Sequence, residues 1–262
     1  MSKRTFDDLV TLMDKLRSPE GCPWDREQTY ETLRPFVIEE AYEVVDAIDR
    51  HDREALEEEI GDLLLEAVFL AQLAKEEGVF EIADSITAVH DKLVHRHPHV
   101  FADVEANSAD EVITNWERLK REEKHQKDKS FFEGVPQALP GLIKAVRLTE
   151  KAARVGFDWR KTDDIFDKLD EEIGELRAAI ENDDATEIRL ELGDLLFTVA
   201  NIARRLGVDA EHALQDSSQK FIRRFETMER SYRDVGKRMD ESSLEELDDA
   251  WERAKAKEMT SE

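Results

Sequence analysis

Residues 169–194 read LDEEIGELRAAIENDDATEIRLELGD, and this stretch decides the fold. Its apolar residues recur at intervals of three and four, which indicates two helices. The triplet Asn182-Asp183-Asp184 between them is typical of a turn. Asp184 followed by Glu187 forms a capping-box pattern for the second helix. The stretch therefore predicts a helical hairpin.

Each helix of this hairpin carries acidic side chains one turn apart. Residues three or four apart share a helix face, so Glu172 and Glu175 project together, as do Glu191 and Asp194. Four unpaired carboxylates in one small volume would repel each other and bind protons more tightly. A hard divalent cation with oxygen ligands resolves this repulsion, and Mg²⁺ is the usual one. We therefore expect a magnesium site formed by these four residues.

The acidic pattern occurs twice in the chain, at a constant offset of 132 residues. In the earlier copy, the equivalents of the four predicted ligands are Glu40, Glu43, Glu59 and Asp62. Further on, a Lys-x-x-x-Arg pair and a Trp-Glu-Arg-x-Lys motif also occur twice in the same order, with offsets that change by a few residues. A repeated, ordered set of this kind indicates two tandem copies of one helical domain.

We expect an all-α protein, because helical periods dominate and no convincing alternating strand is present. The first domain should comprise residues 1–124, the highly charged residues 125–135 a linker, and residues 136–262 the second domain. Outside the second hairpin, apolar periodicity predicts helices at Phe6–Leu16, Thr32–Ile48, Glu54–Glu77, Ile82–His95, Ala109–Lys124 and Leu142–Val155.

The composition restricts the partners of the protein. A formal net charge of −25 repels nucleic acid and anionic membranes, so direct nucleic-acid binding is not expected. No apolar run approaches the roughly 20 residues that a membrane span needs, and the N-terminus lacks a signal-peptide pattern. The single Cys22 excludes an internal disulfide and fits a reducing compartment. We expect a cytoplasmic protein with no membrane partner.

Basic side chains suited to phosphate follow in both copies. Lys220 and Arg224 lie one turn apart on a predicted helix, with Arg223 beside them. Arginine offers a planar fork to phosphate oxygens and lysine a point charge. Surface salt bridges to the abundant acids are the alternative. The duplicate pair Lys92 and Arg96 favours phosphate binding.

Other side chains complete a possible nucleotide site. Lys168 lies one turn before Glu172 and should overlook the acids. Trp251 and Lys255 are one turn apart, so the indole could stack on a base while the lysine reaches phosphate or ribose; a tryptophan that closes the core is the alternative.

One position distinguishes the two copies. Asn201 lies two turns after Asp194, where its amide could bind a ligand or orient a carboxylate. The equivalent residue of the first copy, Phe69, can do neither. This difference favours the second copy as the main active site.

The histidines and the acidic helices raise two other kinds of metal site. The histidines around Pro98 suggest a transition-metal site, although a polar loop is the commoner explanation of such a cluster; they are His90, His95, His97 and His99. A di-iron bundle would require Glu-x-x-His motifs, which the acidic helices lack. A non-catalytic acidic scaffold or regulator remains the alternative to an enzyme.

Several longer motifs resemble the MazG family of all-α nucleoside triphosphate pyrophosphohydrolases. Besides the acidic hairpins, they are CPWDREQTYETLRPFVIEEAYEV (22–44), HRHPHVF (95–101), NWERLKREEK (115–124), VGFDW (155–159) and WERAK (251–255). They extend over nearly the whole chain, in a tandem-domain layout. The resemblance implies two four-helix-type domains, dimerisation, and Mg²⁺-dependent hydrolysis of a nucleoside triphosphate to the monophosphate and pyrophosphate. Dimerisation is also expected because a short helical domain has more apolar surface than it can bury alone.

The resemblance also implies roles for individual residues. The metal ligands would be Glu172, Glu175, Glu191 and Asp194, and Glu40, Glu43, Glu59 and Asp62 would form a possible second metal site in a weakly active or inactive first domain. Glu171 or Glu172 would act as general base, while Lys220 and Arg224 would meet the charge of the leaving pyrophosphate. The substrate-binding set would be Lys168, Glu171, Glu187, Leu190, Asn201, Lys220, Arg223, Arg224, Trp251 and Lys255.

Overall fold

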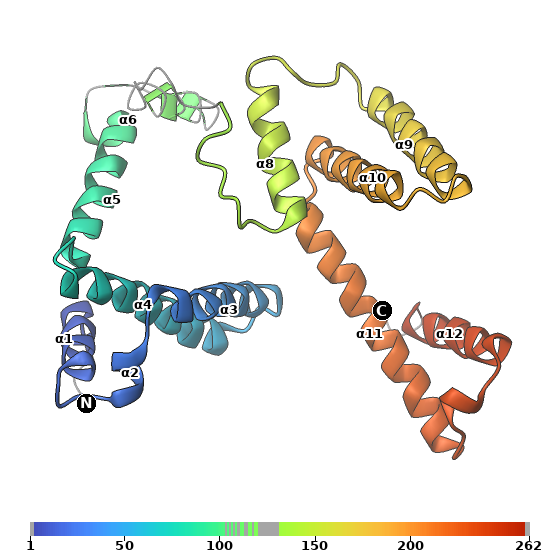
Figure 1. Ribbon diagram of the computed structural model, residues 1–262, viewed down its shortest axis with the longest axis horizontal. Coiled ribbons are helices and arrows are strands. Elements are labelled where there is room, and N and C mark those ends of the chain that lie inside the picture. The colour runs from blue at the N-terminus through green and yellow to red at the C-terminus, as the bar shows by residue number, and fades with distance from the viewer. Residues whose placement is uncertain are drawn as a thin grey trace. The chain divides into compact units, whose positions relative to one another are not determined.

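The computed structural model divides into two compact units, Met1–Lys127 and Asp128–Glu262. It describes residues 3–102, 104, 106, 108, 111–112, 115–116, 118–119 and 131–259. Within these residues all regular structure is helical, as the sequence predicts (Figure 1). Residues 125–130 of the expected linker and most of the expected helix Ala109–Lys124 lie outside the described part of the chain.

Unit 1 is organised around an antiparallel pair of long helices. Its helices are α1 (Phe6–Arg17), α2 (Pro23–Glu27), α3 (Tyr30–Asp49), α4 (Arg53–Glu76), α5 (Ile82–Arg96) and α6 (Pro98–Phe101). The hairpin is formed by α3 and α4, and α1 packs on the C-terminal half of α4. Their apolar faces meet in a buried cluster of Met13, Leu33, Val68, Phe69 and Leu73.

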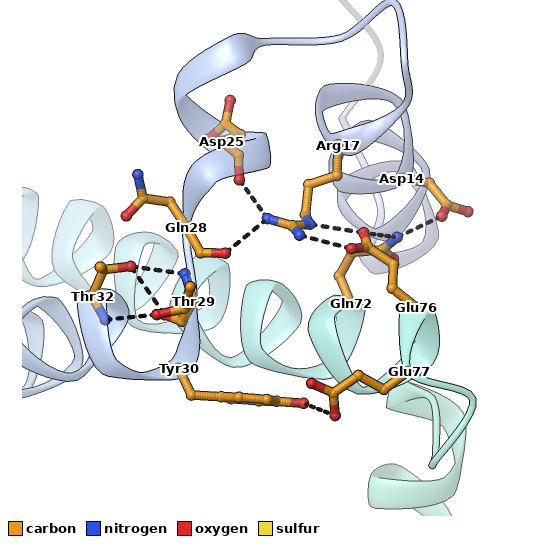
Figure 2. Close-up of polar contacts among 10 residues, drawn as sticks. All are labelled: Asp14, Arg17, Asp25, Gln28, Thr29, Tyr30, Thr32, Gln72, Glu76 and Glu77. Atoms are coloured by element: carbon orange, nitrogen blue, oxygen red, sulfur yellow. Dashed lines mark hydrogen bonds and ion pairs between the residues drawn. The ribbon is translucent and has the colours of Figure 1, made fainter.

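A buried arginine joins α1 to α4 at the edge of this core. Arg17 donates from Nε and Nη2 to the two carboxylate oxygens of Glu76, at 2.7 Å each. Its Nη1 donates to the backbone carbonyls of Asp25 and Gln28 (Figure 2). Beside it, Lys75 of α4 pairs with Asp14 of α1 at 2.7 Å. Because one guanidinium satisfies acceptors from α4 and from the α2 region, it fixes both against α1.

Unit 2 repeats the hairpin and adds a second helical pair. Its helices are α8 (Gly141–Ala153), α9 (Asp163–Glu181), α10 (Ala185–Arg205), α11 (Ala210–Asp234) and α12 (Leu244–Met259), with a short 3₁₀ turn η1 (Met239–Glu241) before α12. The hairpin is formed by α9 and α10, and α8 packs on α10. At the other end of the unit, α11 and α12 pack together around Met228, Tyr232, Ala250 and Ala254 (Figure 1).

The turns of the two hairpins have the same local structure. His51 and Asp183 occupy equivalent positions and both adopt a left-handed backbone, with φ of 54° and 53°. The next residue caps the following helix in each case: Asp52 accepts from two amides of α4, and Asp184 from two amides of α10. The local repeat seen in the sequence is therefore also a structural repeat.

The five predicted helices outside the second hairpin that the structure describes begin and end within two residues of their expected positions. Gly78, in the left-handed region at φ 69°, follows the end of α4. The short helices α2 and α6 were not predicted. Both start with proline at their first position, where its missing N–H costs nothing, and both are too short to show a helical period.

Candidate functional site

The α9–α10 hairpin brings three acidic side chains together. Glu172 and Glu175 of α9 and Glu191 of α10 each offer a carboxylate oxygen, and these oxygens lie within 4.8 Å of one another. Glu172 is buried, with 4% of its surface exposed. Asp194, the fourth predicted ligand, is exposed and lies outside this group of three. The structure thus assembles three of the four expected ligands.

The charges of this cluster act on one another. Burial raises the pKa of Glu191, and the neighbouring carboxylates of Glu175, Glu172 and Asp194 raise it further. A cation among them would reverse this effect, because it favours the ionised form. All the donors are hard carboxylate oxygens, which fit Mg²⁺ and suit softer transition metals poorly.

Lys168 partly neutralises the cluster. Its Nζ lies 2.8 Å from Oε1 of Glu171 and 2.8 Å from Oε1 of Glu172. The hydrogen bond to Glu171 has the larger effect on the pKa of Lys168 and that to Glu172 the next. Both raise this pKa and keep the lysine charged. Lys168 therefore lies beside the acids, where the sequence places it.

Unit 1 contains an equivalent group. Oxygens of Glu40, Glu43 and Glu59 also lie within 4.8 Å of one another. Burial raises the pKa of Glu59, and a hydrogen bond with Glu43 raises it further. Asp62 lies outside the group of three, but its charge contributes, after burial, to the raised pKa of Glu40.

The basic residues predicted to bind phosphate lie against α12. Arg224 donates from Nε to Glu258 at 2.6 Å, and its guanidinium lies 5.9 Å from the ring centroid of Trp251. Arg223 reaches the same glutamate at 3.4 Å, whereas Lys220 is exposed. The contacts described for Arg223, Arg224 and Trp251 are made within α11 and α12. A single chain therefore does not bring these residues to the carboxylates of α9 and α10.

An open groove of about 780 Å³ runs between α11 and α12. Besides Arg223 and Arg224, its lining includes the basic residues Arg230, Arg253 and Lys257, to which the sequence pattern assigned no role. Lys255 lies 3.3 Å from Glu252 of its own helix. Of the other expected substrate contacts, Leu190 is half exposed on α10 and Glu187 is an exposed acid whose charge acts on Glu191.

Asn201 makes a contact that the sequence pattern did not predict. Asn201 is buried, and its Oδ1 accepts a hydrogen bond from Nε of Arg204 at 2.9 Å. Arg204 also forms an ion pair with Asp158 at 2.5 Å. Asn201 therefore belongs to a network that joins the α8–α9 connection to α10. The equivalent Phe69 lies in the core of unit 1 with the Arg17 guanidinium 5.5 Å from its ring. An arginine lies beside the side chain at both positions, Arg204 of the same helix at Asn201 and Arg17 of α1 at Phe69.

The histidines form no metal group in the described residues, and the acidic groups contain none. Nδ1 of His97 lies 2.7 Å from the carbonyl of Leu93, and its ring packs against Trp116 with centroids 4.9 Å apart. His97 lies between α5 and α6, whereas His90 and His95 belong to α5 and His99 to α6, so the polar-loop interpretation fits His97 and not the other three.

One acidic residue near a cluster was missed. Glu66, one turn after Asp62 on α4, is buried, and the charges of Glu40 and Asp62 act on it. The signal is present in the sequence, because Glu66 is the third acid on α4 at helical spacing, after Glu59 and Asp62.

None of the described helices is both long and apolar enough to cross a membrane.

Comparison with known proteins identifies relatives over the whole chain. It is 44% identical over 250 residues to a Thermotoga maritima protein named nucleoside triphosphate pyrophosphohydrolase/pyrophosphatase MazG, covering 95% of both chains. It is 45% identical over 260 residues to an Escherichia coli nucleoside triphosphate pyrophosphohydrolase, covering 97% of this chain and 98% of that protein. A crystal structure of a mazG-related protein from Thermotoga maritima matches 44% of the chain at 32% identity, with a TM-score of 0.39.

The family profile of the MazG nucleotide pyrophosphohydrolase domain matches twice, at residues 28–101 and 161–228. Each match contains one acidic hairpin, α3–α4 or α9–α10. The chain therefore belongs to the MazG family.

Proposed function

We propose that this protein is a Mg²⁺-dependent nucleoside triphosphate pyrophosphohydrolase that releases a nucleoside monophosphate and pyrophosphate. The observation that carries the proposal is the convergence of Glu172, Glu175 and Glu191 in a chain whose near full-length relatives bear that name. The second copy is the proposed active site, because Lys168 accompanies its acids and Phe36 takes the equivalent position in the first copy.

The acidic group would hold the cation. Glu172, Glu175 and Glu191 are its proposed ligands, and Asp194 would join them through a change of side-chain rotamer. When bound, Mg²⁺ supplies Lewis acidity against the negative charge of the triphosphate.

The proton of the attacking water needs an acceptor. Glu171 fits this role best, because it lies outside the group of three and its side chain is 57% exposed. Lys168 pairs with both Glu171 and Glu172. It therefore holds Glu171, the proposed base, beside Glu172, a proposed metal ligand. Glu172 remains the second candidate base.

The leaving pyrophosphate needs positive charge. We assign this to Lys220 and Arg224, with Arg223 assisting, and Arg224 would exchange Glu258 for a phosphate oxygen. Trp251 lies beside Arg224, where it could stack on the base. The acidic overall surface opposes nucleic-acid binding, so free nucleotides are the proposed substrates.

Dimerisation would bring these separated groups together. Leu192, Leu196 and Val199 follow one stripe of α10 and are 46%, 50% and 44% exposed. A Cβ at Gly193, in the same segment, would meet no atom within 4 Å, so space is open beside it. We propose that this face packs on a second copy, since apolar stripes of this kind bury against another helix. Leu196→Glu should shift the protein from dimer to monomer by light scattering, whereas an unchanged mass would contradict this interface.

Pyrophosphate release decides the function. The purified chain should be assayed with the eight common nucleoside triphosphates, in Mg²⁺ and in EDTA. Release that depends on Mg²⁺ supports the proposal, and no turnover of any nucleotide would support the scaffold alternative. Running the reaction in ¹⁸O-water shows the point of attack, because label in the monophosphate indicates the α-phosphorus and label in pyrophosphate the β-phosphorus.

A further inference from the structure

The strongest unexplained feature is Glu66 in unit 1. It is 8% exposed, and its Oε2 is fully buried without a hydrogen-bond partner among the described residues. A carboxylate in such a place is costly unless a proton or a cation accompanies it. The other buried acid near a cluster, Glu172 of unit 2, is paired with Lys168.

Glu66 continues the acidic stripe of α4. Glu59, Asp62 and Glu66 are spaced three and four residues apart, so they share one face of the helix. Burial raises the pKa of Glu66, and the charges of Glu40 on α3 and Asp62 on α4 raise it further. Glu66 lies outside the group of Glu40, Glu43 and Glu59, and the two acids whose charges act on it are Glu40 and Asp62.

The two copies differ in charge at this site. At the offset of 132 residues, Glu66 is replaced by Thr198 in unit 2. Conversely, Lys168 of unit 2 is replaced by Phe36, which packs on the core of unit 1. Unit 1 thus has one more carboxylate and one fewer lysine than unit 2 at equivalent positions.

We propose that Glu66 is an additional ligand of a divalent-cation site in unit 1, formed with Glu40, Glu43, Glu59 and Asp62, which binds its ion without nucleotide. More carboxylates give a site higher affinity for a hard cation and leave fewer positions for phosphate oxygens. The unit 2 site, with fewer acids and a competing lysine, depends more on the phosphates that arrive with the ion. The inference does not require unit 2 to be a hydrolase.

Metal binding by the full chain tests this without an activity assay. Glu175→Gln and Glu191→Gln together remove the unit 2 site. Mn²⁺ is then titrated into nucleotide-free protein, and free Mn²⁺ is followed by electron paramagnetic resonance. We expect one Mn²⁺ per chain, displaced by Mg²⁺ or Ca²⁺. Adding Glu66→Gln should weaken binding by about tenfold or more.

A matched control separates Glu66 from a general charge effect. Glu57→Gln removes the same charge from an exposed position of α4 and should leave the Mn²⁺ affinity unchanged. Thermal unfolding provides a second measurement: Mn²⁺ should raise the Tm of the parent and of Glu57→Gln, and raise that of Glu66→Gln much less. In EDTA, Glu66→Gln should be at least as stable as the parent, because an unpartnered buried acid is removed.

Two results would overturn the proposal. One is that the variant without the unit 2 site, Glu175→Gln with Glu191→Gln, binds no Mn²⁺. The other is a Glu66→Gln variant with the same affinity and the same Mn²⁺-induced rise in Tm as its parent, which would mean that Glu66 is simply a protonated core residue.

Discussion

Lys168 Nζ lies 2.8 Å from Oε1 of Glu172, one turn further along α9. Lys168 forms an ion pair with Glu172, the buried residue of the acidic group. It therefore competes with a cation for the same carboxylate oxygen. The ion pair stabilises the site when no cation is bound, and for the same reason it lowers the affinity of the site for a cation.

Lys168→Met should tighten nucleotide-free binding of Mn²⁺ to unit 2, because the competing charge is removed. An increase of about three- to tenfold is expected, measured by isothermal titration in a background of Glu43→Gln and Glu59→Gln that removes the unit 1 site. Lys161→Met is the matched control, since Lys161 is exposed before α9. Weaker binding by Lys168→Met would show that the lysine supports the site rather than competing with the ion.

Glu191→Gln and Glu59→Gln form a matched pair at equivalent positions of the two hairpins. If unit 2 is the active site, Glu191→Gln should lower kcat for pyrophosphate release by about 100-fold or more, because it removes a proposed ligand of the catalytic cation. Glu59→Gln should change kcat by less than about threefold. Circular dichroism should show full helix content in both. The reverse order of effects would place the active site in unit 1.

Asp158→Asn should destabilise unit 2. Asp158 bonds to Arg204 at 2.5 Å and to Arg205 at 3.3 Å, and all three side chains are mostly buried. Without the carboxylate, the positive charges of Arg204 and Arg205 are less well neutralised. The free energy of unfolding should therefore fall by about 1–3 kcal/mol. Urea unfolding measures this, with the exposed Asp167→Asn as control. Equal stability of the two variants would mean that the network contributes nothing.

The Asp14–Lys75 pair should give unit 1 a pH-dependent stability. The hydrogen bond from Lys75, together with that from Gln72, lowers the pKa of Asp14. A carboxyl whose folded pKa lies below its unfolded value of about 3.9 stabilises the fold above that value. This contribution is lost as the pH falls through the lowered folded pKa.

Lys75→Met tests the sign of this effect. Both side chains are substantially exposed, so the loss at neutral pH should be only about 0.5 kcal/mol. The difference from the parent protein should shrink toward zero as the pH falls through the lowered folded pKa of Asp14, because the carboxyl is then protonated in both proteins. Urea unfolding at a series of pH values measures it, and a difference that grows on acidification would contradict the assignment.

Local pattern was sufficient for the long helices and for the acids that share a face within each of them. The turn at Asp183 and the cap at Asp184 depend on residues next to each other in the chain. The facing of Glu172 and Glu175 depends only on helical spacing. The cap and the paired acids repeat in unit 1 with the same residue types, which is why the amino-acid pattern alone is enough to recognise the tandem organisation.

Roles that depend on distant neighbours could not be predicted in this way. Asn201 has the spacing of a site residue, yet Arg204 and Asp158 hold it in a packing network. Arg224 has the spacing of a phosphate ligand, yet in one chain it pairs with Glu258. Asp158 and Glu258, the acids that complete these contacts, come from elsewhere in the sequence.

The sequence by itself determined that this protein is helical, duplicated and acidic at two matched hairpins, because periodicity, caps and one-turn spacing are properties of adjacent residues. Only the tertiary structure decided which acids converge, that Asp194 lies outside its group, and that Glu66 is buried without a partner among the described residues. The physical reason is that burial and charge compensation depend on which other helices cover a face, and helical spacing along one segment carries no information about that.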